Sequence, residues 1–200
     1  GAKVIRFCPA EGVRRENGEW IIETAQGEIR CEFVVNAAGY RAAEIGRMFG
    51  RNIPCVSVAH QYLVTEEISE LEARSEKLPL LRDPDSSYYL RQEKNGLLLG
   101  PYEKACRAHW ISNDDPMPDD FSFQLYPDDL ERLEWYIDDA CKRVPILGSV
   151  GVTNVVNGPI PYAPDGNPLV GTMPGAPNAF EACAFSFGIV QGGGAGKILA

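Results

Sequence analysis

The segment of this sequence with the clearest chemical potential is a glycine-rich stretch near its C-terminal end. Residues 185–197 read FSFGIVQGGGAGK. A glycine-rich turn that opens a helix exposes several backbone N–H groups at the positive end of the helix dipole, where they can stabilise an anion. The same composition also suits a flexible turn or close helix packing, so both interpretations stay open. A Walker A loop is excluded, because Ile198 follows Lys197 where that motif has Ser or Thr.

Two further segments suit the approach of a ligand. A buried strand is predicted at 31–36 and leads into Ala37-Ala38-Gly39, and small residues at the carboxyl end of a strand let backbone approach a nucleotide closely. Residues 157–168 read NGPIPYAPDGNP, a density of proline and glycine that is typical of a loop of defined shape. Either segment by itself is equally consistent with an ordinary turn.

A candidate acid–base group lies within a predicted strand, 55–65. Period-two alternation places His60 on one apolar face with Val58 and Tyr62. A histidine on such a face is more often a core residue than a catalyst, and both interpretations remain open. In the predicted strand 87–93, the same alternation separates Tyr88 from Tyr89 and Arg91.

Charge and composition exclude several classes of partner. The net charge of −9 argues against nucleic acid as a partner. Ten acidic residues and one basic residue fall within 113–139, a pattern typical of a solvated helix face. The aspartate pairs at 114–115 and 119–120 lack the glycine and alternation of a calcium loop, so no metal site is predicted. No apolar run is long enough for a membrane helix, and six scattered cysteines indicate free, mostly buried thiols in a reducing compartment.

Turn signals and apolar spacing predict a mixed α/β chain. Asn17-Gly18 and Asn95-Gly96 each predict a tight hairpin. Helices are predicted at 41–49 and at 127–143, the second with an apolar stripe of Leu130, Leu133 and Ile137. In the glycine-rich stretch we expect a turn as far as Gly196 and a helix from Lys197.

Five segments in one order resemble a known family. They are VVNAAG at 34–39, HQYLVTE at 60–66, YYLRQE at 88–93 running to GPYE at 100–103, the loop at 157–166, and the glycine-rich end. This set resembles the FAD-dependent amine oxidoreductases of the D-amino-acid-oxidase superfamily, most of all the dimethylglycine and sarcosine dehydrogenases. The resemblance implies an α/β (α+β overall) chain. Residues 1–50 and 151–200 would be parts of a doubly wound FAD-binding domain, and 51–150 would be a substrate domain built on an antiparallel sheet.

The resemblance also implies roles for individual residues. FAD would contact Val13, Ala37, Ala38, Gly39, Gly188, Ile189, Gln191, Gly192 and Gly193. The catalytic candidates are His60 and Tyr89, and the substrate-binding candidates are Tyr88 and Arg91. Hydride would pass from an N-methyl carbon of a secondary or tertiary amino acid to flavin N5, with His60 accepting a proton from the substrate ammonium. The product would be hydrolysed, or passed to tetrahydrofolate if a folate domain lies outside this chain.

Some features depart from the family pattern. The strand and GxGxxG turn that hold the FAD pyrophosphate in this family do not occur in these 200 residues, and the first residue is not Met. We therefore expect an interior fragment that binds FAD weakly or not at all alone. Residue 184 is Ala where relatives usually have Gly.

Alternatives remain at the level of activity. One is another oxidase of the superfamily, acting on D-amino acids or proline-like amines, and another is a non-catalytic binding or assembly module. The electron acceptor would be a carrier flavoprotein or oxygen. The expected location is the cytoplasm, or the mitochondrial matrix in a eukaryote.

Overall fold

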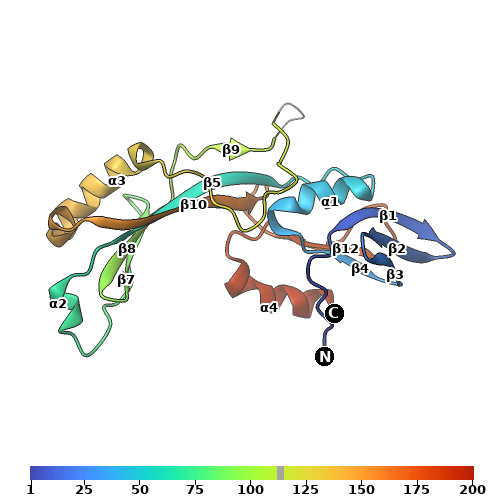
Figure 1. Ribbon diagram of the computed structural model, residues 1–200, viewed down its shortest axis with the longest axis horizontal. Coiled ribbons are helices and arrows are strands. Elements are labelled where there is room, and N and C mark those ends of the chain that lie inside the picture. The colour runs from blue at the N-terminus through green and yellow to red at the C-terminus, as the bar shows by residue number, and fades with distance from the viewer. Residues whose placement is uncertain (112–114) are drawn as a thin grey trace. The chain divides into compact units, whose positions relative to one another are not determined.

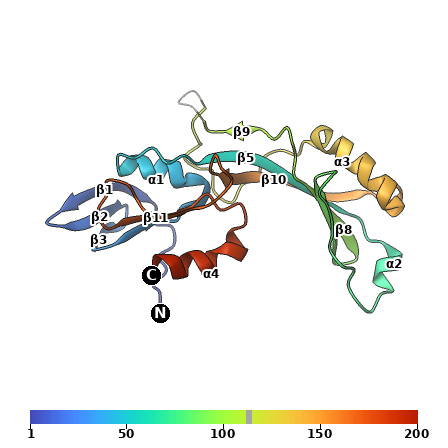
Figure 2. The ribbon, with the colours of Figure 1, turned by 180° about the vertical axis from the view of Figure 1, so that it is seen from behind.

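The chain divides into two compact units, each described here by itself. The computed structural model describes residues 1–111 and 115–200 (Figures 1 and 2). Unit 1 contains Gly1–Ser57 and Ile160–Ala200, and unit 2 contains Val58–Pro159. Asn113 and Asp114 of the acidic stretch lie outside the described residues. The roles predicted for 1–50, 51–150 and 151–200 stay predictions.

Unit 1 has two small sheets. The first is antiparallel, in the order β1 (Ala10–Glu16), β2 (Glu19–Thr24), β3 (Gly27–Cys31). The second has the order β11 (Leu169–Thr172), β12 (Ala179–Cys183), β4 (Val34–Asn36), and its β12–β4 pair is parallel. The hairpin predicted at Asn17-Gly18 is confirmed, with φ of 52° and 90° at the two turn residues. The predicted strand through Cys31 is wrong, because Cys31 ends β3 and β4 is a separate short strand.

The core of unit 1 joins its two chain segments. Its buried members are Trp20, Ala42, Ile53, Met173, Ala176, Ala179 and Cys183. Trp20 donates its indole N–H to the Pro177 carbonyl at 2.9 Å, and its ring meets Phe49 edge-on at 5.0 Å. A short helical turn, η1 (Gly39–Arg41), and α1 (Ala42–Met48) follow β4, in agreement with the helix predicted at 41–49.

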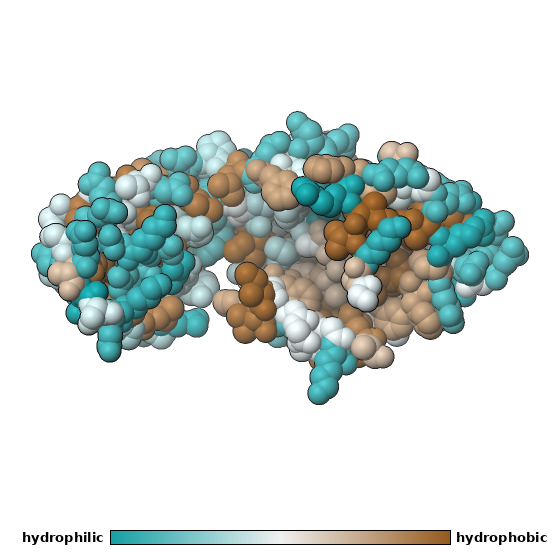
Figure 3. All heavy atoms as spheres, turned by 60° about the horizontal axis from the view of Figure 1, so that its bottom comes forward, coloured by the Kyte–Doolittle hydropathy of each residue, from teal (hydrophilic) through white to brown (hydrophobic). Residues whose placement is uncertain are grey.

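The last helix begins earlier than the sequence indicates. Helix α4 runs Gly188–Leu199, so the glycine-rich stretch is itself helical and the predicted turn to Gly196 is wrong. Glycine disfavours helix by about 1 kcal/mol per residue, which explains why the pattern indicated a turn. The helix buries Ala195 and leaves the apolar side chains of Ile189 and Val190 101% and 84% exposed. Exposed apolar surface on unit 1 is brown in Figure 3.

Unit 2 is built on a largely antiparallel sheet of six strands within the described residues. Their order is β10-β5-β8-β7-β6, with β9 paired to β5. The strands are β5 (Val56–Thr65), β6 (Leu81–Asp83), β7 (Tyr88–Glu93), β8 (Gly96–Pro101), β9 (Ala108–His109) and β10 (Val152–Tyr162). The helical elements are α2 (Ser69–Glu72), α3 (Leu130–Arg143) and η2 (Pro145–Ser149).

Helix α3 covers one face of this sheet and creates the core of unit 2. The core combines Leu133, Tyr136 and Ala140 of α3 with strand residues such as Leu63, Leu90 and Leu99. The predicted stripe was partly wrong, because Leu130 is 46% exposed. Asp129 caps the helix by accepting a hydrogen bond from the Arg132 N–H at 3.3 Å, so α3 begins at Leu130 rather than near Pro127.

The β7–β8 hairpin is confirmed, but its turn is one residue earlier than predicted. The turn residues are Lys94 and Asn95, and Gly96 belongs to β8. A Cβ at residue 96 would lie 2.9 Å from the carbonyl oxygens of Thr65 and Glu66. Glycine is therefore required at 96 by the close approach of β5, not by the turn.

Helices of the described residues are too short or too polar to cross a membrane. The six cysteines are free. Only Cys183 among them is buried, so the expectation of mostly buried thiols is wrong.

Candidate active site

The side of the unit 2 sheet that α3 does not cover carries the candidate residues. Strand β5 buries Ser57, Ala59, Gln61, Leu63 and Thr65, and the alternate residues are more exposed. His60 therefore lies on the open face, where it is partly buried. The β7–β8 register pairs Gly100 with Tyr89 and Leu98 with Arg91, so these residues share that open face.

An aromatic cluster occupies this face. The Tyr102 ring stacks on the His60 ring at 5.9 Å between centroids and lies 5.8 Å from the Tyr89 ring. Tyr102 thus brings together the two catalytic candidates. Sequence reasoning missed it, although residues 98, 100 and 102 alternate onto one side of β8, and that period could have found it.

The Tyr89 ring reaches the cluster because residue 100 is glycine. A Cβ at residue 100 would collide with the Tyr89 ring atoms. Burial raises the pKa of the Tyr89 phenol, and the neighbouring Tyr102 adds to the effect. Tyr89 therefore stays protonated at neutral pH and can donate a hydrogen bond.

His60 is held in its neutral form. Burial lowers its pKa below the ordinary value of 6.5, and the positive charge of Arg132 lowers it further. A neutral imidazole retains a nitrogen lone pair at pH 7, so His60 has the protonation state that a general base requires.

A buried polar network supports the strand beside His60. Glu103 accepts a hydrogen bond from the Gln61 backbone N–H at 3.1 Å, and its other oxygen lies 2.9 Å from Arg132 Nε. The Gln61 side chain accepts from the Asp129 N–H at 2.9 Å and donates to the Asp129 carbonyl at 3.0 Å. These contacts fix β5 to the start of α3, so the backbone that carries His60 has little freedom.

The two substrate-binding candidates lie in different surroundings. Tyr88 is 1% exposed and lies in the core on the α3 side, away from the open face. Arg91 is on the open face, where its guanidinium bonds to the Glu93 carboxylate. The structure thus brings together His60 and Tyr89 through Tyr102, and it does not bring Tyr88 to them.

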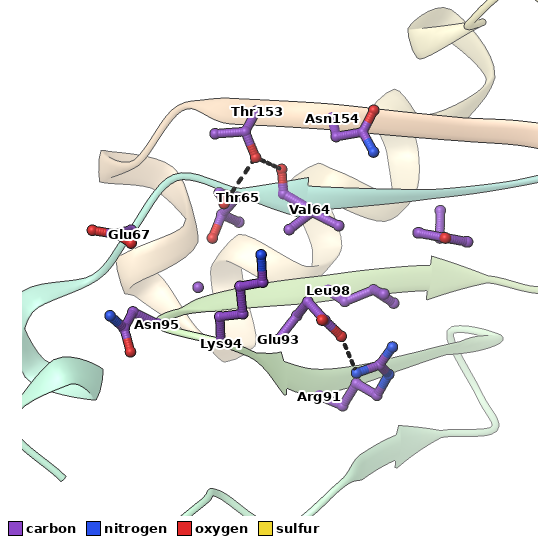
Figure 4. Close-up of a pocket in the computed structure, with 12 residues that line it drawn as sticks. Val64, Thr65, Glu67, Arg91, Glu93, Lys94, Asn95, Leu98, Thr153 and Asn154 are labelled. Atoms are coloured by element: carbon purple, nitrogen blue, oxygen red, sulfur yellow. Dashed lines mark hydrogen bonds and ion pairs between the residues drawn. The ribbon is translucent and has the colours of Figure 1, made fainter.

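Arg91 and Tyr62 also line a pocket of about 530 Å³ on this face (Figure 4). Its polar lining includes Glu67, Lys94 and Asn154. In Figure 4 a dashed line joins Arg91 to Glu93, and the Lys94 side chain extends from the β7–β8 turn toward β5. His60 and Tyr89 are outside this lining. Among the described residues, no group of three or more His, Cys, Asp or Glu side chains could hold a metal ion.

The residues predicted to contact FAD are in unit 1. Val13 is half-buried in β1 and packs on the core. After β4, the Ala38 N–H donates to the Asn36 side chain at 3.3 Å, and the Asn36 amide donates to the Ala42 carbonyl at 2.9 Å. Gly39 follows with φ of 58°, which favours glycine. Asn36 therefore shapes the tight Ala37–Gly39 turn at the carboxyl end of β4.

Helix α4 supplies the other predicted FAD contacts. No side chain caps its first residues, and the first intrahelical bond runs from the Gln191 N–H to the Phe187 carbonyl at 3.1 Å. The N–H groups of Gly188 and Ile189 precede that bond, so helix geometry gives them no acceptor. Apart from the neighbouring residues and backbone of α4 itself, a Cβ on Gly192 or Gly193 would meet no described atom within 4 Å.

Comparison with known proteins shows to which family the chain belongs. The model of the FAD dependent oxidoreductase family matches residues 1–200. The chain belongs to the FAD-dependent oxidoreductase family. It is 45% identical to human mitochondrial dimethylglycine dehydrogenase over 189 residues, covering 92% of this chain and 22% of that protein. It is 37% identical to human mitochondrial sarcosine dehydrogenase over 207 residues, covering 100% of this chain and 22% of that one.

A solved structure has a similar fold. L-proline dehydrogenase from P. horikoshii matches 100% of this chain and 50% of its own with a TM-score of 0.79, at 24% identity. The mixed α/β fold of this family is therefore the fold of the chain, as predicted. The chain spans only about a fifth of the length of the two dehydrogenases.

FAD is the cofactor of the family, and two observations fit it to these residues. The N–H groups at the start of α4 are suited to a negatively charged or carbonyl group. The buried side-chain oxygen of Gln191 has no hydrogen-bond partner among the described residues, and a buried polar atom of this kind calls for one. These observations are compatible with Gly188, Ile189 and Gln191 holding the polar edge of the flavin, which stays a prediction.

Proposed function

We propose that the protein containing this chain oxidises an N-methylated amino acid, such as dimethylglycine or sarcosine, in an FAD-dependent oxidative N-demethylation. The observation that carries the proposal is the His60–Tyr102–Tyr89 cluster on the open face of unit 2. It combines a neutral imidazole with a protonated phenol. The similarity to dimethylglycine and sarcosine dehydrogenases supports this substrate class.

The residues of this chain perform the proton chemistry. A substrate ammonium must lose a proton before its nitrogen lone pair can assist the departure of hydride from the methyl carbon. An imidazole nitrogen of His60 accepts that proton. The Tyr89 phenol donates a hydrogen bond that orients the substrate, and the Tyr102 ring packs beside both. Bound FAD would supply the two-electron oxidant, with the hydride as the carrier of both electrons. Water then hydrolyses the iminium product to the demethylated amine and formaldehyde.

A substrate panel tests the proposal. The flavin-loaded protein is mixed anaerobically with dimethylglycine, sarcosine, L-proline, D-alanine and glycine, and flavin bleaching and formaldehyde are measured. We expect bleaching with formaldehyde release for the N-methylated substrates alone. Bleaching by proline or D-alanine without formaldehyde would instead identify another oxidase of the family. The isolated 200 residues are expected to purify with little flavin, so a stoichiometric flavin absorbance band would contradict that expectation.

The partners follow from the same chemistry. The electron acceptor would be a carrier flavoprotein or oxygen, and tetrahydrofolate would accept the one-carbon unit if the protein has a folate domain elsewhere. The site of action would be the mitochondrial matrix if the source is a eukaryote, since the two dehydrogenases are mitochondrial proteins, and the cytoplasm otherwise.

A further inference from the structure

The Arg82 guanidinium lies beside the aromatic cluster. In the β6–β7 register Arg82 pairs with Tyr89, and Tyr89 pairs with Gly100, so one row across the sheet carries all three on the open face. The Arg82 guanidinium carbon lies 5.2 Å from the centre of the Tyr102 ring. The same ring stacks on His60. Tyr102 is therefore the shared neighbour of the imidazole and the guanidinium.

The charge of Arg82 is available to a ligand. Within the described residues no ion pair or hydrogen bond holds its guanidinium, and the side chain is exposed. The adjacent carboxylate, Asp83, points to the other face and pairs with Arg143 at 2.8 Å. Contact with an aromatic face holds a guanidinium in place while leaving its N–H donors free.

Arg91 differs from Arg82 in this respect. The Arg91 guanidinium is bonded to the Glu93 carboxylate, two residues along the same strand. A substrate carboxylate that approached Arg91 would meet the negative charge of Glu93. Arg91 lines the pocket near the β7–β8 turn.

We propose that Arg82, oriented by Tyr102, binds the carboxylate of the substrate and thereby selects amino acids over simple amines. The proposal rests on the proposed function and names the residue that recognises the substrate class. An α-amino acid carries its carboxylate one carbon from its nitrogen. A carboxylate bound by Arg82 therefore directs the amino group toward His60, on the same side of the sheet. A guanidinium binds a carboxylate through two parallel N–H···O bonds, which fixes orientation as well as affinity.

The test compares ligands with and without the carboxylate. The flavin-loaded protein is titrated with methoxyacetate, a carboxylate that cannot be oxidised, and the flavin absorbance change gives its Kd. The rates of flavin reduction by sarcosine and by sarcosine amide are then compared, because the amide lacks the carboxylate charge. Arg82→Met is expected to weaken methoxyacetate binding and raise the KM for sarcosine by about 10- to 100-fold. The response to the amide should change by less than about 3-fold. Arg82→Lys should restore part of the loss.

Arg74→Met is the matched control, because Arg74 is an exposed arginine of unit 2 whose Nε donates to the Glu76 carbonyl. It should bind both ligands as the wild type does. An equal loss for sarcosine and its amide in Arg82→Met would overturn the proposal, as would a carboxylate-selective loss in Arg91→Met alone. A wild type that binds methoxyacetate but oxidises no N-methylated amino acid would refute the proposed function. In that case the methoxyacetate titration alone would decide whether Arg82 binds a carboxylate.

Discussion

The phenol ring of Tyr89 lies against the α-carbon of Gly100, in the space that a methyl group on residue 100 would need. The two residues are directly paired on β7 and β8. This contact lets Tyr89 lie across the sheet toward Tyr102, so the aromatic cluster depends on a residue that has no side chain.

Replacing Gly100 by Ala should displace Tyr89. We expect a loss of about 1–3 kcal/mol in the free energy of unfolding, since the added methyl group overpacks a filled site. Flavin reduction should slow as well. Urea unfolding measures the first effect and stopped-flow absorbance the second. Gly148→Ala is the control, because a Cβ there makes only an ordinary contact with Cys141 at 3.8 Å. In the double variant with Tyr89→Ala, the Gly100→Ala substitution should cost much less, and equal costs in both backgrounds would refute the contact.

The rate of flavin reduction should fall at low pH, when His60 becomes protonated. Burial and the charge of Arg132 lower its pKa below 6.5, so the imidazole is neutral at pH 7 and the rate of flavin reduction is at its plateau. The rate should fall only as pH is lowered through that depressed pKa. His60→Gln should remove this step and slow reduction by about 10²- to 10⁴-fold. His109→Gln is the control, since His109 stacks on Tyr126 and also has a lowered pKa. If the rate of flavin reduction in His60→Gln still fell at low pH, the group that titrates would be a residue other than His60.

Arg132→Met should destabilise unit 2 strongly and in a pH-dependent way. It leaves the Glu103 carboxylate buried without its cation, which costs about 3–5 kcal/mol at pH 7. Burial already raises the pKa of Glu103, against the opposing effect of Arg132. The folded variant therefore favours protonated Glu103, and that stabilisation is present at low pH and is lost as pH rises through the raised pKa. Urea unfolding at pH 4.5 and pH 7 should show the smaller loss at pH 4.5.

The control for this network is Arg30→Met. Arg30 pairs with Glu16 at 3.2 Å, with both side chains about half exposed, so its removal should cost less than about 1 kcal/mol. An equal cost for Arg30→Met and Arg132→Met would show that burial of the Glu103 pair does not matter.

The thiols should react in order of their exposure. Burial raises the pKa of Cys183 to about 12, so almost none of it is thiolate at pH 8, whereas Cys106 is exposed. Iodoacetamide followed by peptide mass spectrometry should find Cys106 modified first and Cys183 only after unfolding. Early modification of Cys183 in the Cys106→Ser variant would contradict its burial in the core of unit 1.

Local chemistry made part of this fold predictable. Asn17-Gly18 predicted its hairpin because both positions adopt positive φ, and few other sequences do so at low cost. Alternation on β5 correctly separated His60 from Gln61, since a strand allows only two faces. The alternation did not indicate which of the two faces of β5 is buried. Apolar residues lie on the open side, whereas Gln61 is buried because the Asp129 backbone and Glu103 satisfy its polar groups.

Other features could not be predicted from the sequence, because they depend on contacts between segments that are far apart in the chain. Gly96 resembled a turn residue, although the carbonyl groups that exclude a side chain there belong to Thr65 and Glu66. The sequence did not indicate Arg82 as a candidate, because its proposed role depends on the β6–β7 register and on contact with the Tyr102 ring. In α4 the local preference of glycine opposed the helix that forms. The order of motifs revealed the family because it sums many weak local signals, but it does not state which side chains meet.

The chain enters unit 2 along β5 and leaves it along β10, and these two strands are hydrogen-bonded neighbours. A segment whose ends lie on adjacent strands can be exchanged between homologous proteins with only two joints to rebuild. Residues 58–159 thus form a natural module for recombination. Evolution, or a protein engineer, can change the side chains proposed to bind the substrate while the flanking sequence predicted to contact FAD stays constant.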